Sequence, residues 1–215
     1  MGEPGFLFGP AVPDGFHYRA DFVSAAEELE LAAALERISF SDFEMRGVTA
    51  KRRVAFFGRS YGQEVVPPVP EFLLPLRAAV AAWAGIEPGA FVMALVNEYR
   101  PGSPIGWHRD APQYGQVAGV SLLSSCRMRF RPYAEAGRGP AEGPRRATHE
   151  IVLEPRSAYL MTGAARASYE HHVPPVAALR YSITFRTLRS DPARASGAGP
   201  AGNAGPAATS PAPRE

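Results

Sequence analysis

The chain has 215 residues, a length that suits one domain or one domain with a tail. Hydrophobic residues make up 46% and charged residues 20%, a composition that is typical of a globular protein and excludes a disordered or fibrous chain. The formal net charge of +2 neither requires nor excludes a nucleic-acid partner, because clustering of charge on one face decides that question.

Cysteine usage and hydropathy limit the compartment. Cys126 is the single cysteine, so an intrachain disulfide and a metal site built on several cysteines are excluded. No stretch approaches the roughly 20 apolar residues that cross a bilayer, and the N-terminus lacks the pattern of a signal peptide. We therefore expect a cytoplasmic monomer with no membrane partner.

Two helices are predicted before residue 91. Ser24 and Glu27 have the spacing of a capping box, and apolar residues then recur at helical intervals as far as Ile38. The second helix follows the proline-rich VVPPVP, starts with Phe72 and ends at Gly85. Each helix has one apolar stripe, which is suited to packing against a sheet.

From residue 91 the pattern changes to short strands separated by Gly, Pro and Ser. The predicted strands are 91–99, 117–123, 127–133, 149–154, 157–162 and 179–188, with a turn region at 134–146. Helices followed by strands of similar length favour a helix-buttressed β-sandwich or barrel of jelly-roll type. After Arg189 the sequence is rich in Ala, Gly, Pro and Ser, so we expect one domain over 1–189 and a disordered tail over 190–215.

A candidate metal site contains histidine and aspartate. His108 and Asp110 are separated by one residue, so on an extended backbone both side chains face the same way and can bind one cation. A third ligand must come from a distant segment, and the pair His171–His172 is the obvious source. Two histidines and one carboxylate leave coordination positions open, as in non-haem Fe(II) oxygenases, whereas a structural zinc site would be closed. By itself the H-x-D spacing is a weak signal.

A second cluster lies on the last predicted strand. In RYSITFR, residues 180–186, the even positions Arg180, Ser182, Thr184 and Arg186 share one strand face. Two arginines on the inward face of a barrel strand are costly to bury without anionic partners. A small dicarboxylate would supply those partners.

Taken together, these motifs resemble the AlkB family of 2-oxoglutarate and Fe(II)-dependent dioxygenases. NEYRPG, HRD, HHVPP and RYSITFR reproduce the motifs of that family in order, and the match covers about residues 50–188. The resemblance implies an α+β fold, a double-stranded β-helix (jelly roll) buttressed by N-terminal helices.

The resemblance also implies roles for individual residues. The catalytic iron would be bound by His108, Asp110 and His171, and 2-oxoglutarate would be bound by Asn97, Tyr99, Arg180, Ser182, Thr184 and Arg186. Ser182 stands where the family has Asn, and Pro112 stands where the founding member has an acidic residue, so the base preference does not transfer.

Predicted substrate contacts begin with KRRVAFFGRSYG, residues 51–62, which resembles the strand of relatives that carries base-stacking aromatic residues. Cations alternate there with rings, a composition that suits gripping phosphates and stacking a flipped base, although an ordinary amphipathic strand is the alternative. The predicted substrate-binding residues are Arg53, Phe57, Tyr61, Trp107 and Arg166. Arg127, Arg129 and Arg131 alternate on another strand and form either a solvated face or a phosphate-contacting face.

The function implied by the family is oxidative dealkylation of N-alkylated bases in DNA or RNA, such as 1-methyladenine, 3-methylcytosine or etheno adducts. Such an enzyme uses Fe(II), 2-oxoglutarate and O₂ and releases succinate, CO₂ and an aldehyde. The partner would be alkylated DNA or RNA, single- or double-stranded. Two alternatives stay open: an AlkB-like oxygenase acting on a tRNA modification or a protein side chain, and a catalytically inactive jelly-roll binding module.

Overall fold

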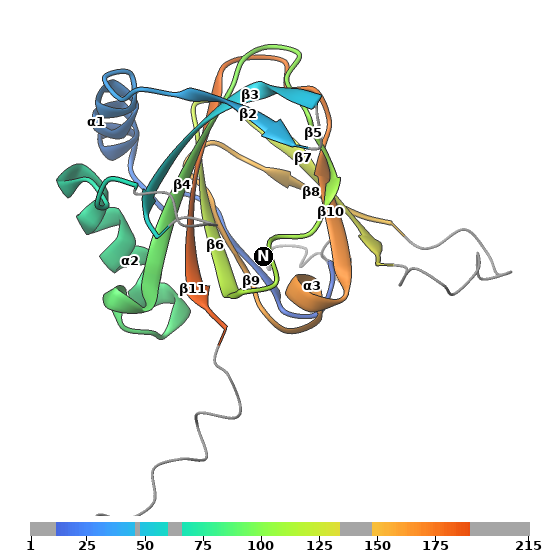
Figure 1. The fold of residues 1–215 in the computed structure, drawn as a ribbon. Coiled ribbons are helices and arrows are strands. Elements are labelled where there is room, and N and C mark those ends of the chain that lie inside the picture. Colours follow the sequence, from blue (N-terminus) through green and yellow to red (C-terminus); the bar gives the residue numbers. More distant parts are fainter. Residues whose placement is uncertain (1–11, 46–47, 60–65, 134–147, 190–215) are drawn as a thin grey trace, which may run out of the picture.

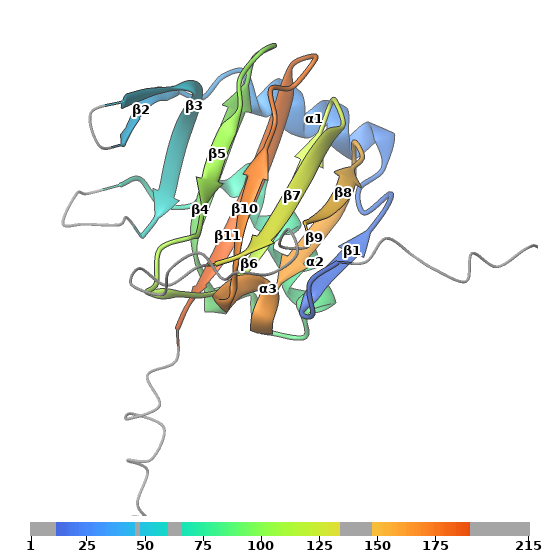
Figure 2. The same ribbon diagram turned by 90° about the vertical axis from the view of Figure 1, so that its right-hand side faces the viewer.

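The computed structural model describes residues 12–45, 48–59, 66–133 and 148–189, which form two antiparallel sheets that face each other (Figure 1, Figure 2). The seven-stranded sheet has the order β1-β9-β6-β11-β4-β3-β2 and the four-stranded sheet has the order β5-β10-β7-β8. The strands of the larger sheet are β1 (Phe16–Arg19), β2 (Ser41–Met45), β3 (Val48–Gly58), β4 (Phe91–Tyr99), β6 (Tyr114–Leu122), β9 (Ala158–Met161) and β11 (Arg180–Leu188). Those of the smaller sheet are β5 (Ile105–His108), β7 (Cys126–Pro132), β8 (His149–Leu153) and β10 (Tyr169–Val173).

The helices α1 (Ala25–Leu35) and α2 (Leu74–Ala84) cover the outer face of the seven-stranded sheet (Figure 1). The shorter elements are η1 (Glu71–Leu73), η2 (Pro88–Ala90) and α3 (Gly163–Ala167). The main core lies between these helices and the sheet, where Leu35 and Val80 pack with Ile183 and Phe185 of β11. Among the described residues, no helix has the length and apolar character needed to cross a membrane.

Alternation along β11 decides what lies between the two sheets. Tyr181, Ile183 and Phe185 belong to the core under the helices, so the residues between them point the other way, towards the four-stranded sheet. Burying one face of the sheet under helices therefore directs the polar set of RYSITFR into the interior of the jelly roll.

Both predicted helices are present, with ends that have clear local causes. Ser24 caps α1, since its Oγ accepts a hydrogen bond from the Glu27 N–H (3.2 Å) while the Ser24 N–H donates to Glu27 Oε2 (2.7 Å). The second helix begins as η1 before continuing as α2, and it ends at Gly85, whose φ of 68° is in the left-handed region that glycine favours.

All six predicted strands are present, with bounds that differ by at most three residues, and the jelly-roll fold class is confirmed. The strands β1, β2, β5 and β10 and the helix α3 were not predicted from the sequence. They are four or five residues long, too short for a reliable period, and β5 pairs only because β10 lies beside it. The predicted tail 190–215 and most of the predicted turn region 134–146 lie outside the described residues.

Candidate active site

A cavity of ≈ 740 Å³ lies between the two sheets and contains most of the residues predicted to carry the chemistry. Both sheets contribute to it, because the inward faces of β3, β4 and β11 meet the inward faces of β5, β7 and β10. The predicted residues in its wall are Asn97, Tyr99, Trp107, His108, Asp110, His171, Arg180, Ser182, Thr184 and Arg186.

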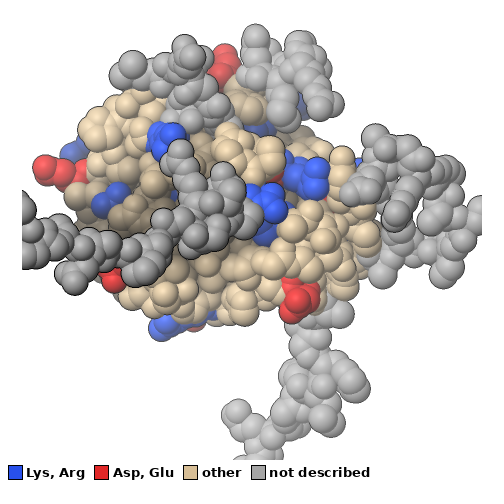
Figure 3. All heavy atoms as spheres, turned by 60° about the horizontal axis from the view of Figure 1, so that its bottom comes forward, with Lys and Arg blue, Asp and Glu red and all other residues tan. Residues whose placement is uncertain are grey.

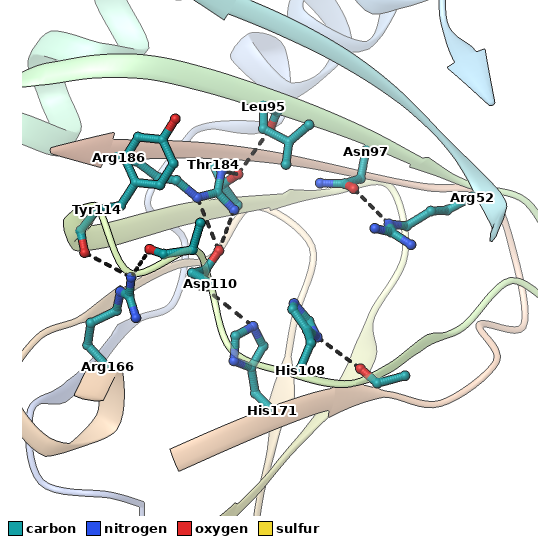
Figure 4. A network of polar contacts seen from close by, with 12 residues as sticks. Arg52, Leu95, Asn97, His108, Asp110, Tyr114, Arg166, His171, Thr184 and Arg186 are labelled. Carbon is teal, nitrogen blue, oxygen red and sulfur yellow. Dashed lines mark hydrogen bonds and ion pairs between the residues drawn. The ribbon is translucent and has the colours of Figure 1, made fainter. Parts of the chain in front are cut away.

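The two histidines are brought together by strand pairing. His108 at the end of β5 lies directly opposite His171 of β10, with ring centroids 4.2 Å apart. Asp110 follows two residues after His108, and its Oδ2 lies 3.8 Å from Nε2 of His171 (Figure 4). His108 Nδ1 lies 2.9 Å from the Gly106 carbonyl oxygen. If Nδ1 donates to that carbonyl, the lone pair of Nε2 is left for a metal.

Burial sets the charge state of these three groups. Burial lowers the pKa of His108, and burial followed by the charge of His108 lowers the pKa of His171 to about 3, so both rings are neutral near pH 7. Burial raises the pKa of Asp110, but Arg186 and the two histidines outweigh that effect and hold this pKa well below its usual range. One carboxylate and two neutral imidazoles are a donor set that suits Fe(II).

The donor atoms are close together but do not surround a common point. In the described part of the chain, no three His, Cys, Asp or Glu side chains are arranged to hold a metal ion. In Figure 4, Asp110 turns Oδ1 towards Arg186, whose Nη2 and Nε lie 2.6 and 3.1 Å away. The fit to iron therefore rests on the identity and proximity of the donors, not on a preformed cage.

Arg186 links the carboxylate to the sheet. Its Nη1 donates to Thr184 Oγ1 (2.9 Å), and that hydroxyl donates to the Leu95 carbonyl oxygen (3.1 Å). Because both partners are on paired strands, the guanidinium and the Asp110 carboxylate are held in one orientation.

Arg180 is the most informative side chain in the cavity wall. It is 2% exposed, its Nη2 donates to Ser121 Oγ (2.6 Å), and its guanidinium lies 5.1 Å from the centre of the Tyr99 ring. Its buried Nε has no hydrogen-bond partner, and no carboxylate in the described ranges forms an ion pair with it. A buried guanidinium without an anion is costly, so the site is suited to an anionic ligand.

Two further predicted residues, Asn97 and Tyr99, lie beside Arg180 in the cavity. The Asn97 Oδ1 accepts a hydrogen bond from Arg52 Nε (3.1 Å), which fixes the orientation of the amide. Burial raises the pKa of Tyr99, so its hydroxyl keeps the proton that it can donate.

Tyr159 is among the cavity residues that were not identified from the sequence. Tyr159 of β9 is paired with Gly119 of β6, and a Cβ at Gly119 would fall 2.6 Å from the Tyr159 hydroxyl and closer still to its ring. The absence of a side chain at Gly119 therefore lets the Tyr159 ring lie across β6 and reach the cavity. Neither a lone Tyr in a short strand nor a Gly in another strand signals this contact, because it depends on their pairing.

Two of the predicted substrate contacts, Arg53 and Phe57, are on the wrong face of β3. Register with β4 directs both towards the helix-covered side, where Arg53 forms an ion pair with Glu98 (2.7 Å) and Phe57 joins the core. The residues of β3 that line the cavity are Arg52, Val54 and Phe56. Successive residues of a strand point to opposite faces, and the prediction assigned the odd-numbered residues of β3 to the cavity. The sequence KRRVAFF did not decide between the two faces, because several of its adjacent positions are compatible with either one.

The remaining predicted substrate contacts have different outcomes. Trp107 lines the cavity, but its ring also stacks on His172, with ring centroids 5.0 Å apart. The Arg131 guanidinium carbon lies 4.4 Å from the centre of the same Trp107 ring. Arg166 does not line this cavity, because its Nη2 donates to the carbonyl oxygens of Ala111 (2.7 Å) and Tyr114 (2.8 Å) and so holds the loop after Asp110. Tyr61 lies outside the described residues.

The alternating arginines of β7 are paired with carboxylates. Arg129 donates to Glu150 and Arg131 donates to Glu170, while Arg127 lies 3.8 Å from Glu150. These pairs neutralise much of the charge on the outer face of the smaller sheet, which favours the solvated-face interpretation of this strand.

Comparison with known proteins agrees with the fold and with the use of Fe(II). A family model described as the 2OG-Fe(II) oxygenase superfamily matches residues 20–186. The chain therefore belongs to this superfamily, whose members use Fe(II), 2-oxoglutarate and O₂, and it is an AlkB-like dioxygenase within it.

Individual relatives match about four fifths of the chain. The Alkylated DNA repair protein ALKBH8 homolog of Arabidopsis thaliana is 27% identical over 211 residues, which is 83% of this chain and 59% of that protein. The chain thus spans little more than half the length of that relative. The structure of OsALKBH1 superposes with a TM-score of 0.63 at 15% identity, over 82% of this chain and 100% of that one. The crystal structure of a Pseudomonas putida prolyl-4-hydroxylase superposes with a TM-score of 0.56 at 17% identity, over 82% of this chain and 94% of that one. These two likenesses concern the fold alone.

Proposed function

We propose that this chain removes N-alkyl groups from bases of DNA or RNA by oxidation, with Fe(II), 2-oxoglutarate and O₂. The observation that carries the proposal is Arg180, a buried cation without an anionic partner in the described residues, in the same cavity as His108, Asp110 and His171. The name of the Arabidopsis relative, an alkylated DNA repair protein, supports a nucleic-acid substrate.

The iron would be held by His108, Asp110 and His171. His108 is oriented by the Gly106 carbonyl, and Asp110 keeps Oδ2 on the side of His171 while Arg186 occupies Oδ1. Hydrogen bonds from neighbouring groups to the ligand side chains fix the orientation and the protonation of metal ligands. When bound, Fe(II) activates O₂ in a reaction coupled to oxidative decarboxylation of 2-oxoglutarate.

The cosubstrate would lie between the two buried arginines. Arg180 would pair with one carboxylate of 2-oxoglutarate and Arg186 with the other, each guanidinium being able to make two parallel hydrogen bonds. The hydroxyls of Tyr99, Ser182 and Thr184 and the amide of Asn97 would bind the same molecule, since all four side chains line the cavity. Ser182 can donate or accept a hydrogen bond although it is shorter than the Asn of the family.

The substrate base would enter between β3 and β5. Arg52, Phe43 and Phe56 line that part of the cavity, and the Arg52 guanidinium lies over the Phe43 ring (4.6 Å). A cavity of ≈ 740 Å³ is large enough for the cosubstrate and one extruded base. For an N-methyl base, one oxygen atom of O₂ enters the methyl group and the other enters succinate. The hydroxyl group of the resulting N–CH₂OH would then lose its proton to water while its oxygen forms the C=O bond of formaldehyde, and the N–C bond would break with its electron pair left on the nitrogen.

The proposal is tested by titrating the protein anaerobically with Fe(II) and 2-oxoglutarate, followed by aerobic assay of formaldehyde and succinate. Methylated single-stranded DNA, double-stranded DNA and RNA are the three substrates. We expect formaldehyde from at least one of them, in step with succinate. Binding of both ligands without formaldehyde from any substrate would reject the nucleic-acid assignment and favour a protein side chain. Failure to bind 2-oxoglutarate would favour a binding module without catalysis.

A further inference from the structure

A second hollow adjoins the active-site cavity on the other side of the segment that carries the proposed metal ligands. Its volume is ≈ 1100 Å³, and residues 107–111 form a wall common to both spaces. The rest of its lining comes from the loop after Asp110, from the start of β6, from α3 with the preceding Thr162, from the end of β11, and from Tyr133 and Glu170. The hollow is therefore separated from the active-site cavity only by the segment that carries His108 and Asp110.

Three arginines line this hollow: Arg109, Arg166 and Arg189. We call it the arginine hollow. Within the described ranges none of the three forms an ion pair with a carboxylate, in contrast to Arg53, Arg129 and Arg131. The two carboxylates in its wall are already engaged, Asp110 by Arg186 and Glu170 by Arg131. The hollow therefore has an uncompensated positive charge.

The arginines are close enough to repel each other. Burial lowers the pKa of Arg166 and the Asp110 charge opposes this, while Arg186, Arg109 and Arg189 lower it further. The Nε of Arg166 is also buried without a hydrogen-bond partner in the structure. An anion in the hollow would relieve this repulsion.

Arg109 is held ready for such a ligand. Its guanidinium lies 3.5 Å from the centre of the Tyr133 ring, and its Nη1 donates to the Ala167 carbonyl oxygen (3.3 Å). Figure 3 views the side of the molecule where α3 and the end of β11 lie, and it shows basic side chains both near the middle of this face and towards its margin. A guanidinium fixed by stacking loses little freedom when it binds a phosphate.

We propose that the arginine hollow binds the sugar–phosphate backbone of the substrate strand, beside the base that occupies the active site. The inference rests on the proposed function for the identity of the polymer. The size of the arginine hollow suits a stretch of backbone better than one small anion, and its positive charge favours a polyanion. Arg166 also holds the loop after Asp110 through its Nη2, so Arg109 and Arg189 are the residues to test.

The test measures binding of an unmodified single-stranded oligonucleotide to the full chain by fluorescence anisotropy over a range of salt concentrations. The double variant Arg109→Gln/Arg189→Gln is compared with Arg53→Gln/Arg156→Gln, which removes the same charge from two arginines that are paired with carboxylates. We expect the first variant to bind about tenfold more weakly and its salt slope to fall by roughly 1.4, about 0.7 for each lost contact to a single strand. The control should keep the slope of the unchanged protein.

Two outcomes would overturn the inference: an unchanged salt slope in the first variant, or an equal fall in both variants. An acidic peptide of equal charge is measured in parallel, and if only its binding depends on Arg109 and Arg189 the hollow is a protein-binding site instead. Because the oligonucleotide is unmodified and no turnover is needed, the result is independent of the dealkylation assay. If the salt slope of Arg109→Gln/Arg189→Gln falls as expected but the protein releases no formaldehyde from any substrate, the dealkylation reaction is rejected and the backbone-binding site is retained.

Discussion

At the scale of single residues, substitution of Arg180 is expected to change stability and ligand binding in opposite directions. Arg180→Met removes a buried charge that has no anionic partner in the described structure. We expect the free energy of unfolding without ligands to rise by about 1–2 kcal/mol, while affinity for 2-oxoglutarate falls at least about 100-fold. Urea denaturation and calorimetric titration measure the two effects. A less stable variant that still binds 2-oxoglutarate would contradict the role given to this residue.

The neighbouring histidines provide a matched pair of substitutions. His171 faces His108 across the strand pair, whereas His172 stacks on Trp107 on the opposite face of β10. We expect His171→Ala to lose most of its affinity for Mn²⁺, used as a redox-stable substitute for Fe(II), and His172→Ala to retain it within about threefold. Calorimetric titration with Mn²⁺ distinguishes them, and the reverse order would show that the wrong histidine has been chosen.

Gly119 tests the contact that brings Tyr159 into the cavity. A methyl group at this position collides with the Tyr159 ring, so the ring must move away or the two strands must separate. We expect Gly119→Ala to cost about 1–3 kcal/mol of stability, the usual range for overpacking. Thermal unfolding measures this loss. The double variant Gly119→Ala/Tyr159→Ala should recover part of it, and no recovery would place the strain elsewhere.

At the scale of elements, the start of α1 is a site where sequence and structure agree atom by atom. Ser24→Ala removes the hydroxyl that accepts from the Glu27 N–H, and a lost N-cap costs about 1 kcal/mol. In a domain of this size that corresponds to a fall of about 2–4 °C in Tm. Ser39→Ala, at an exposed position after the same helix, is the control and should leave Tm nearly unchanged.

Strand pairing also explains why the candidate site was only partly predictable. β11 has a long run in which polar and apolar residues alternate, so the inward set Arg180, Ser182, Thr184 and Arg186 could be predicted with its orientation. The sequence of β3 is compatible with either set of alternate residues facing the cavity. Only the register of β3 with β4 directs Arg52 instead of Arg53 into the cavity. Prediction of a substrate face therefore failed where local alternation did not specify one phase.

At the scale of the whole molecule, the cavity lies between the two sheets, and both contribute residues to its wall. A dicarboxylate bound between Arg180 and Arg186 of β11 would give Arg180 the anionic partner that it lacks among the described residues. We expect 2-oxoglutarate with Mn²⁺ at about 100 times the dissociation constant to stabilise the protein by about 2.7 kcal/mol. With Mn²⁺ present throughout, differential scanning calorimetry should show a rise in Tm on addition of 2-oxoglutarate that is mostly lost in Arg180→Met, and an equal rise in that variant would place the ligand elsewhere.

The sequence by itself determined the two helices, the long strands, the jelly-roll class and the motifs that resemble the AlkB family, because each depends on local periodicity or on spacing within one segment. Only the tertiary structure decided which face of β3 meets the cavity, that Tyr159 reaches it across Gly119, and that Arg109, Arg166 and Arg189 share one hollow. These features arise from pairing and packing between segments far apart in the chain. Periodicity within one segment contains no information about the partner against which that segment will lie.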